Sequence, residues 1–133
     1  MTRFLPAIAR ILLGLVFFVF GLNGFLHFIP QPETMPEEVT ALFTGFTKSR
    51  FMLPMIFATQ TLVGVLLLTN RFVPLALALI APVVVNIVLL HLFIEPSGLP
   101  IALVVLALEL YLAWAYRGAF RPMLAPRVAP TSK

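Results

Sequence analysis

Residues 71–96, RFVPLALALIAPVVVNIVLLHLFIEP, contain the stretch that decides the fold of this chain. The apolar run from Phe72 to Ile94 is long enough to cross the hydrocarbon core of a bilayer, which is about 30 Å thick. Pro82 lies inside this run, and its missing N–H leaves the carbonyl of Ala78 without its usual helix donor. A membrane helix tolerates such a proline where neighbouring helices or side chains supply a partner. We therefore expect other helices to surround this one.

The composition excludes a soluble domain of this size. Of the 133 residues, 61% are hydrophobic and 11% are charged, whereas soluble domains contain about 45–50% apolar and about 25% charged residues. The absence of cysteine excludes thiol–disulfide chemistry and cysteine-ligated clusters within this chain. The net charge of +4 does not indicate a nucleic-acid partner, because the cations follow the pattern of membrane topology described below.

Four apolar segments have the length of a membrane-spanning helix and predict an all-α fold, a four-helix transmembrane bundle. These segments are residues 5–29, 51–69, 72–94 and 99–116. In the first loop, Thr34 and Glu37 have the spacing of a capping box. Apolar residues then recur at helical intervals, which predicts a short amphipathic interfacial helix over residues 35–47, acting either as a packed lid or as a gate. Residues 1–117 would form the membrane domain and residues 118–133 a basic cytoplasmic tail.

The distribution of lysine and arginine predicts the orientation of the four spans. Two cations, Lys48 and Arg50, lie in the first loop. The others lie in the N-terminus, the second loop and the tail, and are Arg3, Arg10, Arg71, Arg117, Arg121, Arg127 and Lys133. Cytoplasmic loops of membrane proteins carry an excess of such residues. We therefore expect a multi-pass protein with both termini in the cytoplasm.

Six polar side chains lie inside the apolar spans. Inserting an ionised side chain at the centre of a membrane helix costs roughly 2.5–3.5 kcal/mol of free energy, so such residues usually face a bundle interior or a cavity. We therefore treat the six as candidate ligand-binding residues. They are Asn23, His27, Gln60, Asn86, His91 and Glu109. The rise of about 1.5 Å per residue places both histidines near the outer boundary, both asparagines about one turn deeper, and Gln60 and Glu109 near mid-membrane. Asn23 and His27 share a helix face, whereas Asn86 and His91 are about 140° apart and cannot both face inward from a straight helix.

Each of these residues also has a structural interpretation. The asparagines and the glutamine can form hydrogen bonds between helices. Glu109 can be a neutral carboxyl that donates a hydrogen bond, or alternatively a proton relay or a cation site. The histidines can belong to the interface, bind a quinone carbonyl, or ligate a haem axially. A cytochrome of the b type would show more glycines to make room for its ring, so the sequence disfavours haem.

The most specific hypothesis is a quinone site between the first and third spans. Asn23, His27 and Asn86 would supply the polar groups, and the kink at Pro82 would open the pocket. A quinone has two carbonyl acceptors, which match an imidazole N–H and an amide NH₂ as donors. The apolar walls would be Phe20, Phe28 and Val83, and the amphipathic helix would cover the mouth.

Two stretches, ARILLGLVFFVFGLNGFLHFIP at residues 9–30 and LLLTNRFVPLALALIAPVVVNIVLLHLF at residues 66–93, resemble the DoxX-like family of small bacterial membrane proteins. The resemblance extends over roughly residues 8–117 and is carried by Gly14, Gly21, Asn23, His27, Asn86 and His91. It implies a four-helix bundle in the bacterial inner membrane, related to the membrane subunit of thiosulfate:quinone oxidoreductase. The family has no agreed catalytic residues, so the resemblance implies none here.

Gly14 and Gly21 also share a helix face, where small residues let membrane helices approach closely. The alternative is that they are ordinary glycines of a membrane helix.

These observations favour an integral membrane subunit of a redox or quinone-linked system, with lipid and the proteins of a membrane redox complex as partners and with no nucleic acid. A homo-oligomer is compatible with the sequence. The competing class is a non-enzymatic lipid-binding or assembly subunit, in which the polar residues only join helices. A third class, a small transporter, would require oligomerisation, because four short helices leave little room for a pathway.

Overall fold

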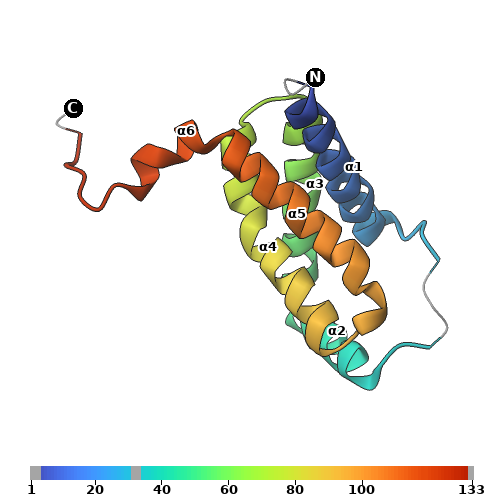
Figure 1. Ribbon diagram of the computed structural model, residues 1–133. Helices are drawn as coiled ribbons and strands as arrows, with labels where there is room; N and C mark the ends of the chain where they lie inside the picture. The colour runs from blue at the N-terminus through green and yellow to red at the C-terminus, as the bar shows by residue number, and fades with distance from the viewer. Residues whose placement is uncertain (1–3, 31–33, 132–133) are drawn as a thin grey trace.

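The computed structural model describes residues 4–30 and 34–131, and within these ranges the chain is built from helices. The long helices are α1 (Leu5–Leu26), α3 (Met52–Leu68), α4 (Val73–Phe93) and α5 (Leu99–Ala115). The shorter elements are α2 (Glu37–Ser49), the 3-10 turn η1 (Pro96–Gly98), α6 (Arg117–Phe120) and the 3-10 turn η2 (Arg121–Leu124) (Figure 1). The predicted all-α helical bundle is confirmed.

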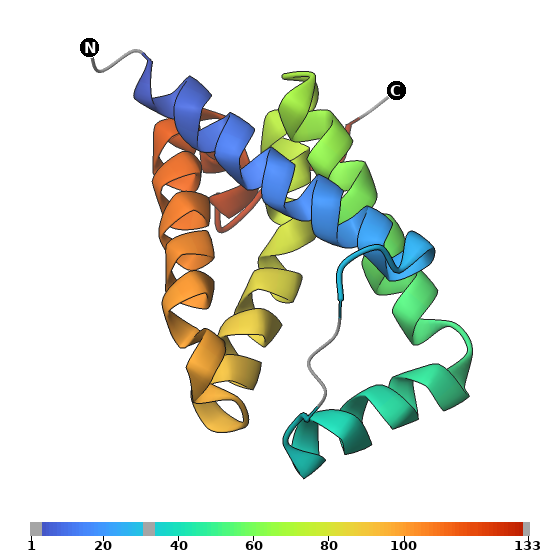
Figure 2. The same ribbon diagram turned by 90° about the vertical axis from the view of Figure 1, so that its right-hand side faces the viewer.

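The four long helices form a closed ring in which each helix has two neighbours. α1 packs on α3, α3 on α4, α4 on α5, and α5 returns to α1 (Figures 1 and 2). Successive helices run in opposite directions, so the start of α1, the α3–α4 connection and the end of α5 gather at one end. We call this the terminal end. The opposite end, which carries α2 and η1, is called the α2 end.

Glycines bring α1 and α3 into close contact. A Cβ atom added at Gly21 would lie 2.4 Å from Thr61 Oγ1, and one added at Gly64 would lie 2.5 Å from the backbone nitrogen of Phe18. A Cβ atom added at Gly14 would lie 3.0 Å from a side-chain atom of α3. Distances this short leave no room for a larger side chain unless the helices move apart. The structure therefore confirms that Gly14 and Gly21 face a neighbouring helix and permit its close approach.

The apolar core fills the half of the bundle nearest the terminal end. It is contributed by α1 and α4 from their first turns to their middle, by the second half of α3, and by the middle and end of α5. Its buried members are Ala9, Leu13, Phe17, Val63, Leu67, Val73, Ala76, Leu77, Ile80, Val84, Val105 and Leu112. Towards the α2 end the α1–α3 pair and the α4–α5 pair spread apart (Figure 2). The packed core therefore gives way to a more open half, which is where the candidate site lies.

Arg10 satisfies the end of a neighbouring helix within this packed half. It lies in the second turn of α1, and its guanidinium Nη1 donates a hydrogen bond to the carbonyl oxygen of Leu67, in the last turn of α3. The last carbonyls of a helix lack intrahelical donors and carry the negative end of the helix dipole. A cation at this position therefore stabilises the α3 terminus.

Three helical segments have the length and composition of membrane spans: α1, α4, and η1 together with α5. α3 has 17 residues and meets the same standard only when it is joined to α2, from which it is bent by 95°. The chain is therefore a multi-pass membrane protein, and its described residues contain three spans, or four when the bent α2–α3 pair counts as one. The exposed apolar side chains on the outside of the bundle contact lipid.

α1 ends at Leu26, whereas the sequence predicted a span to Ile29. His27 adopts a left-handed conformation, with φ 54° and ψ 48°, which ends the regular helix. The backbone N–H of Ile29 then donates to Asn23 Oδ1 at 2.7 Å instead of to a helical carbonyl. The Asn23 side chain thus accepts the hydrogen bond that a backbone carbonyl would have accepted from Ile29 in a longer helix.

α2 begins at Glu37, two residues later than predicted, and the predicted capping box is not formed. Pro36 is the N-cap, has φ −52° and ψ 144°, and makes no side-chain cap hydrogen bond. A residue before proline is disfavoured in the helical region, so Met35 is a poor position for a helix to start. Of the apolar residues expected on one face of this helix, Val39 is buried, whereas Leu42 is exposed.

The basic tail starts with ordered turns. After α5 the chain continues through α6 and η2, and Phe120 packs against the apolar core. The guanidinium carbon of Arg117 lies 4.4 Å from the centroid of the exposed Trp114 ring, and its Nη1 donates to the Trp114 carbonyl oxygen at 2.9 Å. Two of the cations used to predict the orientation, Arg3 and Lys133, lie outside the described residues.

Candidate ligand-binding site

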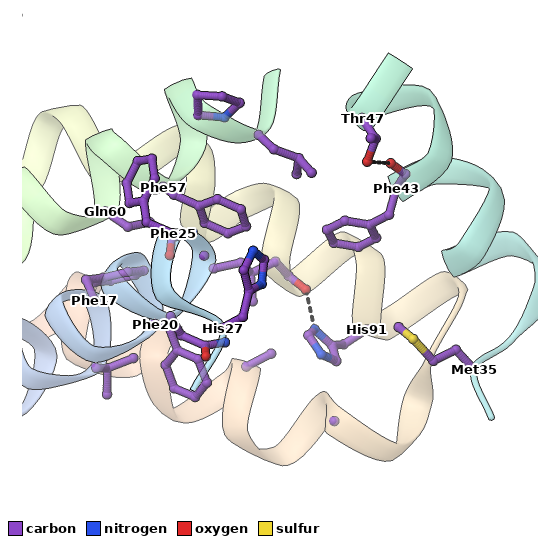
Figure 3. A pocket seen from close by; sticks show the side chains of 18 of the residues that line it. Phe17, Phe20, Phe25, His27, Met35, Phe43, Thr47, Phe57, Gln60 and His91 are labelled. Carbon is purple, nitrogen blue, oxygen red and sulfur yellow. Dashed lines mark hydrogen bonds between the residues drawn. The ribbon is translucent and has the colours of Figure 1, made fainter. Parts of the chain in front are cut away.

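A cavity of about 1090 Å³ occupies the half of the bundle nearest the α2 end (Figure 3). It is lined by all four long helices and by α2. Most of its walls are apolar, with Phe17, Phe20, Phe43 and Phe57 among the largest side chains. Ligand sites generally combine such walls with a few converging polar groups, and this cavity has that composition.

The end of α1 contributes two polar residues, Asn23 from the last turn and His27 as the C-cap. The backbone N–H of His27 donates to the Asn23 carbonyl at 2.8 Å, which closes the helix. Because Asn23 Oδ1 already accepts from Ile29, the amide nitrogen of Asn23 is the atom left to meet a ligand. His27 lines the cavity as an exposed residue, and its backbone is left-handed, a conformation that histidine adopts more readily than most residues.

α3 contributes Gln60, which is 8% exposed and lines the cavity. One turn earlier, the ring of Phe57 lies directly over Gly24, where an added Cβ would be 2.1 Å from the ring. Phe57 also makes an edge-to-face contact with Phe25, with 6.1 Å between the centroids and 71° between the ring planes. This packing fixes the aromatic wall beside Gln60.

α4 contributes His91 from its last turn. His91 Nδ1 lies 2.7 Å from the carbonyl oxygen of Ile87, which lines the same cavity one turn earlier (Figure 3). Gly98, the last residue of η1, lies against the other edge of the ring. The imidazole is therefore fixed by its own helix on one side and by η1 on the other.

α2 closes the site with residues that the sequence analysis did not select. Thr40, Phe43, Thr44, Thr47 and Lys48 line the cavity, and the spacing of three, four and seven residues puts them on one helix face. The Thr47 hydroxyl donates to the Phe43 carbonyl at 2.8 Å. The sequence does contain a signal for this face, the recurrence of threonine at helical intervals. It lies outside the apolar spans that contain the six candidate residues.

Asn86 does not reach the cavity. It is exposed, and its Nδ2 donates to the carbonyl oxygen of Pro82 at 2.9 Å, within its own helix. Of the two residues that could not both face inward, His91 faces the cavity and Asn86 faces away. The predicted walls change accordingly, since Phe20 lines the cavity whereas Phe28 and Val83 do not.

Glu109 lies outside the cavity, in the packed half of the bundle. It is one turn beyond Val105, which lines the cavity, and its side chain is 7% exposed. Its Oε1 atom is buried and has no hydrogen-bond partner among the described residues. Of the six predicted residues, four therefore meet around the cavity, and Asn86 and Glu109 are placed elsewhere.

The ring of apolar helices and the cavity between them define a multi-pass helical membrane protein with a partly open space of ligand size. A protein-family model described as DoxX matches residues 5–92, about two thirds of the chain, and the chain belongs to this family. The match covers α1 to α3 and nearly all of α4, including Asn23, His27, Gln60 and His91. No curated protein and no solved structure matches the chain.

Proposed function

We propose that the chain is a membrane subunit of a redox or quinone-linked system in the bacterial inner membrane, and that it binds a quinone or a similar apolar ligand. The observation that carries this proposal is the cavity of about 1090 Å³ at the α2 end, whose mostly apolar walls include Asn23, His27, Gln60 and His91 among their polar residues. Ligand pockets for molecules of drug size have volumes of about 300–1,000 Å³. The space therefore suits a ring with an apolar substituent.

The chemistry of the lining fits a quinone head group. Its two carbonyl oxygens need hydrogen-bond donors, and the amide nitrogens of Asn23 and Gln60 offer them. The faces of the ring would meet the side chains of Phe20, Phe43 and Phe57. An apolar tail would follow the remaining aliphatic wall, so each part of the ligand meets a surface of matching polarity.

The cation distribution supports an orientation with the terminal end in the cytoplasm and the α2 end outside. α2 would then cover the site from the outer surface as a lid or gate. A bound quinone needs an electron partner, and a chain without cysteine offers no thiol or iron–sulfur route. The proposed role is therefore to hold the quinone within a larger complex.

The proposal is tested on the full chain purified in detergent. Organic extraction followed by mass spectrometry should recover quinone in addition to phospholipid. Calorimetric titration with duroquinone should show binding, and Asn23→Asp and Gln60→Leu should each weaken it about 5-fold, because one hydrogen bond contributes about 1 kcal/mol. Aspartate is chosen at position 23 because it keeps the oxygen that accepts from the Ile29 N–H and removes only the NH₂ donor.

The matched control is Asn86→Leu, which changes an amide that faces away from the cavity. This variant should bind duroquinone like the parent. If the parent binds no quinone, or if neither cavity variant changes the affinity, the proposal is wrong.

The second candidate is a lipid-binding or assembly subunit. One observation favours it: Asn23 Oδ1 and His91 Nδ1 already bond to backbone groups of their own segments, as purely structural side chains would. An acyl chain would also fit the apolar walls. This function would be supported if organic extraction yields phospholipid without quinone and if calorimetric titration with duroquinone shows no binding.

A further inference from the structure

We infer that a hollow at the start of the tail binds the phosphate of an anionic phospholipid headgroup. The hollow is lined by Ala115, Arg117, Gly118 and Arg121, and we call it the tail hollow. It lies at the terminal end of the bundle and shares no lining residue with the cavity at the α2 end. Its occupant is therefore a second ligand, bound independently of the proposed quinone.

The tail hollow is small and open. Its volume is about 260 Å³, whereas pockets for ligands of drug size start at about 300 Å³. The chain bends around it from the last residue of α5, Ala115, through α6 to the first residue of η2, Arg121. Gly118 adds no side chain to this space, and a Cβ atom placed there would meet nothing within 4 Å. The space therefore suits one small polar group that arrives from outside.

The two arginines of the tail hollow have donors to spare. Arg117 Nη1 donates to the Trp114 carbonyl oxygen at 2.9 Å, and its guanidinium carbon lies 4.4 Å from the centroid of the Trp114 ring, so the group is held in place. The Nε and Nη2 atoms of Arg117 and the whole guanidinium of Arg121 make no hydrogen bond with other described residues. The planar fork of an arginine binds a phosphate through two parallel N–H groups. A phosphate in the hollow would satisfy both arginines.

No carboxylate of the described residues offsets this positive charge. The two glutamates of α2 and Glu95, which precedes η1, lie at the opposite end of the bundle. Glu109 is buried within the bundle, and its Oε1 atom has no hydrogen-bond partner among the described residues. Arg71, in the α3–α4 connection, adds another exposed cation at the terminal end. The charge of this end therefore attracts an anion.

The position of the tail hollow along the bundle indicates that this anion belongs to a lipid. The span Pro96–Ala115 ends at its wall, and a group just beyond the end of a span lies at the level of the headgroups, where an exposed tryptophan such as Trp114 is typical. The chain after α5 leads sideways from the terminal end (Figure 1). In η2, Met123 and Leu124 are 68% and 79% exposed. Cations beside exposed apolar side chains, next to a membrane span, are typical of a segment that binds anionic lipid.

The test is native mass spectrometry of the full chain in a non-ionic detergent, titrated with phosphatidylglycerol or with phosphatidylcholine of the same acyl chains. We expect tighter binding of phosphatidylglycerol, by about 5-fold for each arginine that contacts the phosphate. Arg121→Gln should therefore reduce the preference about 5-fold. The matched control is Arg127→Gln, which removes the same charge from an exposed residue outside the tail hollow and should keep the preference.

A second pair of variants leaves both arginines unchanged. Gly118→Glu places a carboxylate beside them and should abolish the preference for phosphatidylglycerol, whereas Gly118→Ala adds a Cβ atom in open space and should keep it. Thermal unfolding of each variant shows whether the bundle is intact.

Three results would overturn this inference. Equal affinities of the parent for the two lipids would show that the headgroup is not selected. Equal losses in Arg121→Gln and Arg127→Gln would show a diffuse surface charge without a site. Glycerol phosphate that binds as tightly as phosphatidylglycerol would show that the tail hollow takes a soluble anion. The duroquinone titration is unaffected by each of these results.

Discussion

At Glu109 a carboxyl group lies within the apolar core, one turn from the cavity floor. The helical rise puts it about 9 Å from the terminal end of α5, and Arg10 about 8 Å from the terminal end of α1. The Arg10 guanidinium is nevertheless bonded to the Leu67 carbonyl. No ion pair with Glu109 is formed among the described residues. These surroundings suit a neutral side chain, because an unpaired buried charge costs several kcal/mol.

Glu109→Gln should therefore leave the thermal unfolding temperature of the purified protein within a few degrees of the parent, because an amide of nearly the same size replaces a neutral carboxyl. Glu109→Lys should abolish accumulation in the membrane, because it forces a cation into the packed core. The control is Glu38→Lys on the exposed face of α2, which should be tolerated. A large loss of stability in the glutamine variant would show that the carboxylate is charged and paired.

Sequence reasoning identified the polar residues of the spans but not where each side chain goes. Asn23, His27, Gln60 and His91 do reach the cavity. Asn86 was misplaced because an amide four residues after a proline can bond to that proline's carbonyl and leave the site altogether. The angular argument required one of Asn86 and His91 to face away, and the choice between them depended on this local hydrogen bond.

Among the elements, α1 and α3 form the tightest pair. The backbone of Phe18 lies against Gly64, where an added Cβ would be 2.5 Å from its nitrogen. A backbone atom cannot rotate away as the end of a side chain can. The two helices must therefore separate to accept any larger residue at this position.

Gly64→Ala should destabilise the protein by about 2 kcal/mol, the usual cost of overpacking a rigid contact. The matched control is Gly45→Ala in α2, where the added Cβ meets nothing within 4 Å. That change should be neutral or stabilising by up to about 1 kcal/mol, because alanine favours the helix. The measurement is denaturant unfolding in detergent micelles. Equal stabilities for the two variants would contradict the close α1–α3 contact.

The long helices were predictable because a run of about 20 apolar residues has few alternatives in a membrane. Their ends were not, because they depend on particular groups such as the Asn23 side chain and the ring of Pro36. The cavity-facing residues of α2 were also missed, because threonines and a lysine on a short helix indicate a solvent-facing surface when only the sequence is considered.

Over the whole molecule, packing and open space are divided between the two ends. The apolar core occupies the terminal half and the cavity the α2 half, with Phe17 and Val105 contributing to both. This division could not be read from local patterns, because it results from the angles at which four helices cross. It also predicts that cavity variants will change binding more than stability.

The orientation remains a prediction from the cations, and it is tested with three fusions. Green fluorescent protein at the C-terminus should fluoresce, because that end is expected in the cytoplasm, and alkaline phosphatase there should be inactive. Alkaline phosphatase fused after Arg50, just beyond α2, should be active outside. The reverse pattern would place the cavity on the cytoplasmic side and require a different source of ligand.

Trp114 is the only tryptophan of the chain, and it stands exposed in the last turn of α5 beneath the Arg117 guanidinium. It lies about 14 Å along the helix from Val105, the lining residue of α5 nearest to it in sequence. The protein's ultraviolet emission therefore reports on the lipid boundary at the terminal end. The tryptophan emission should therefore not change when a ligand fills the cavity. It should change when the detergent is exchanged or when the lipid headgroup composition is altered.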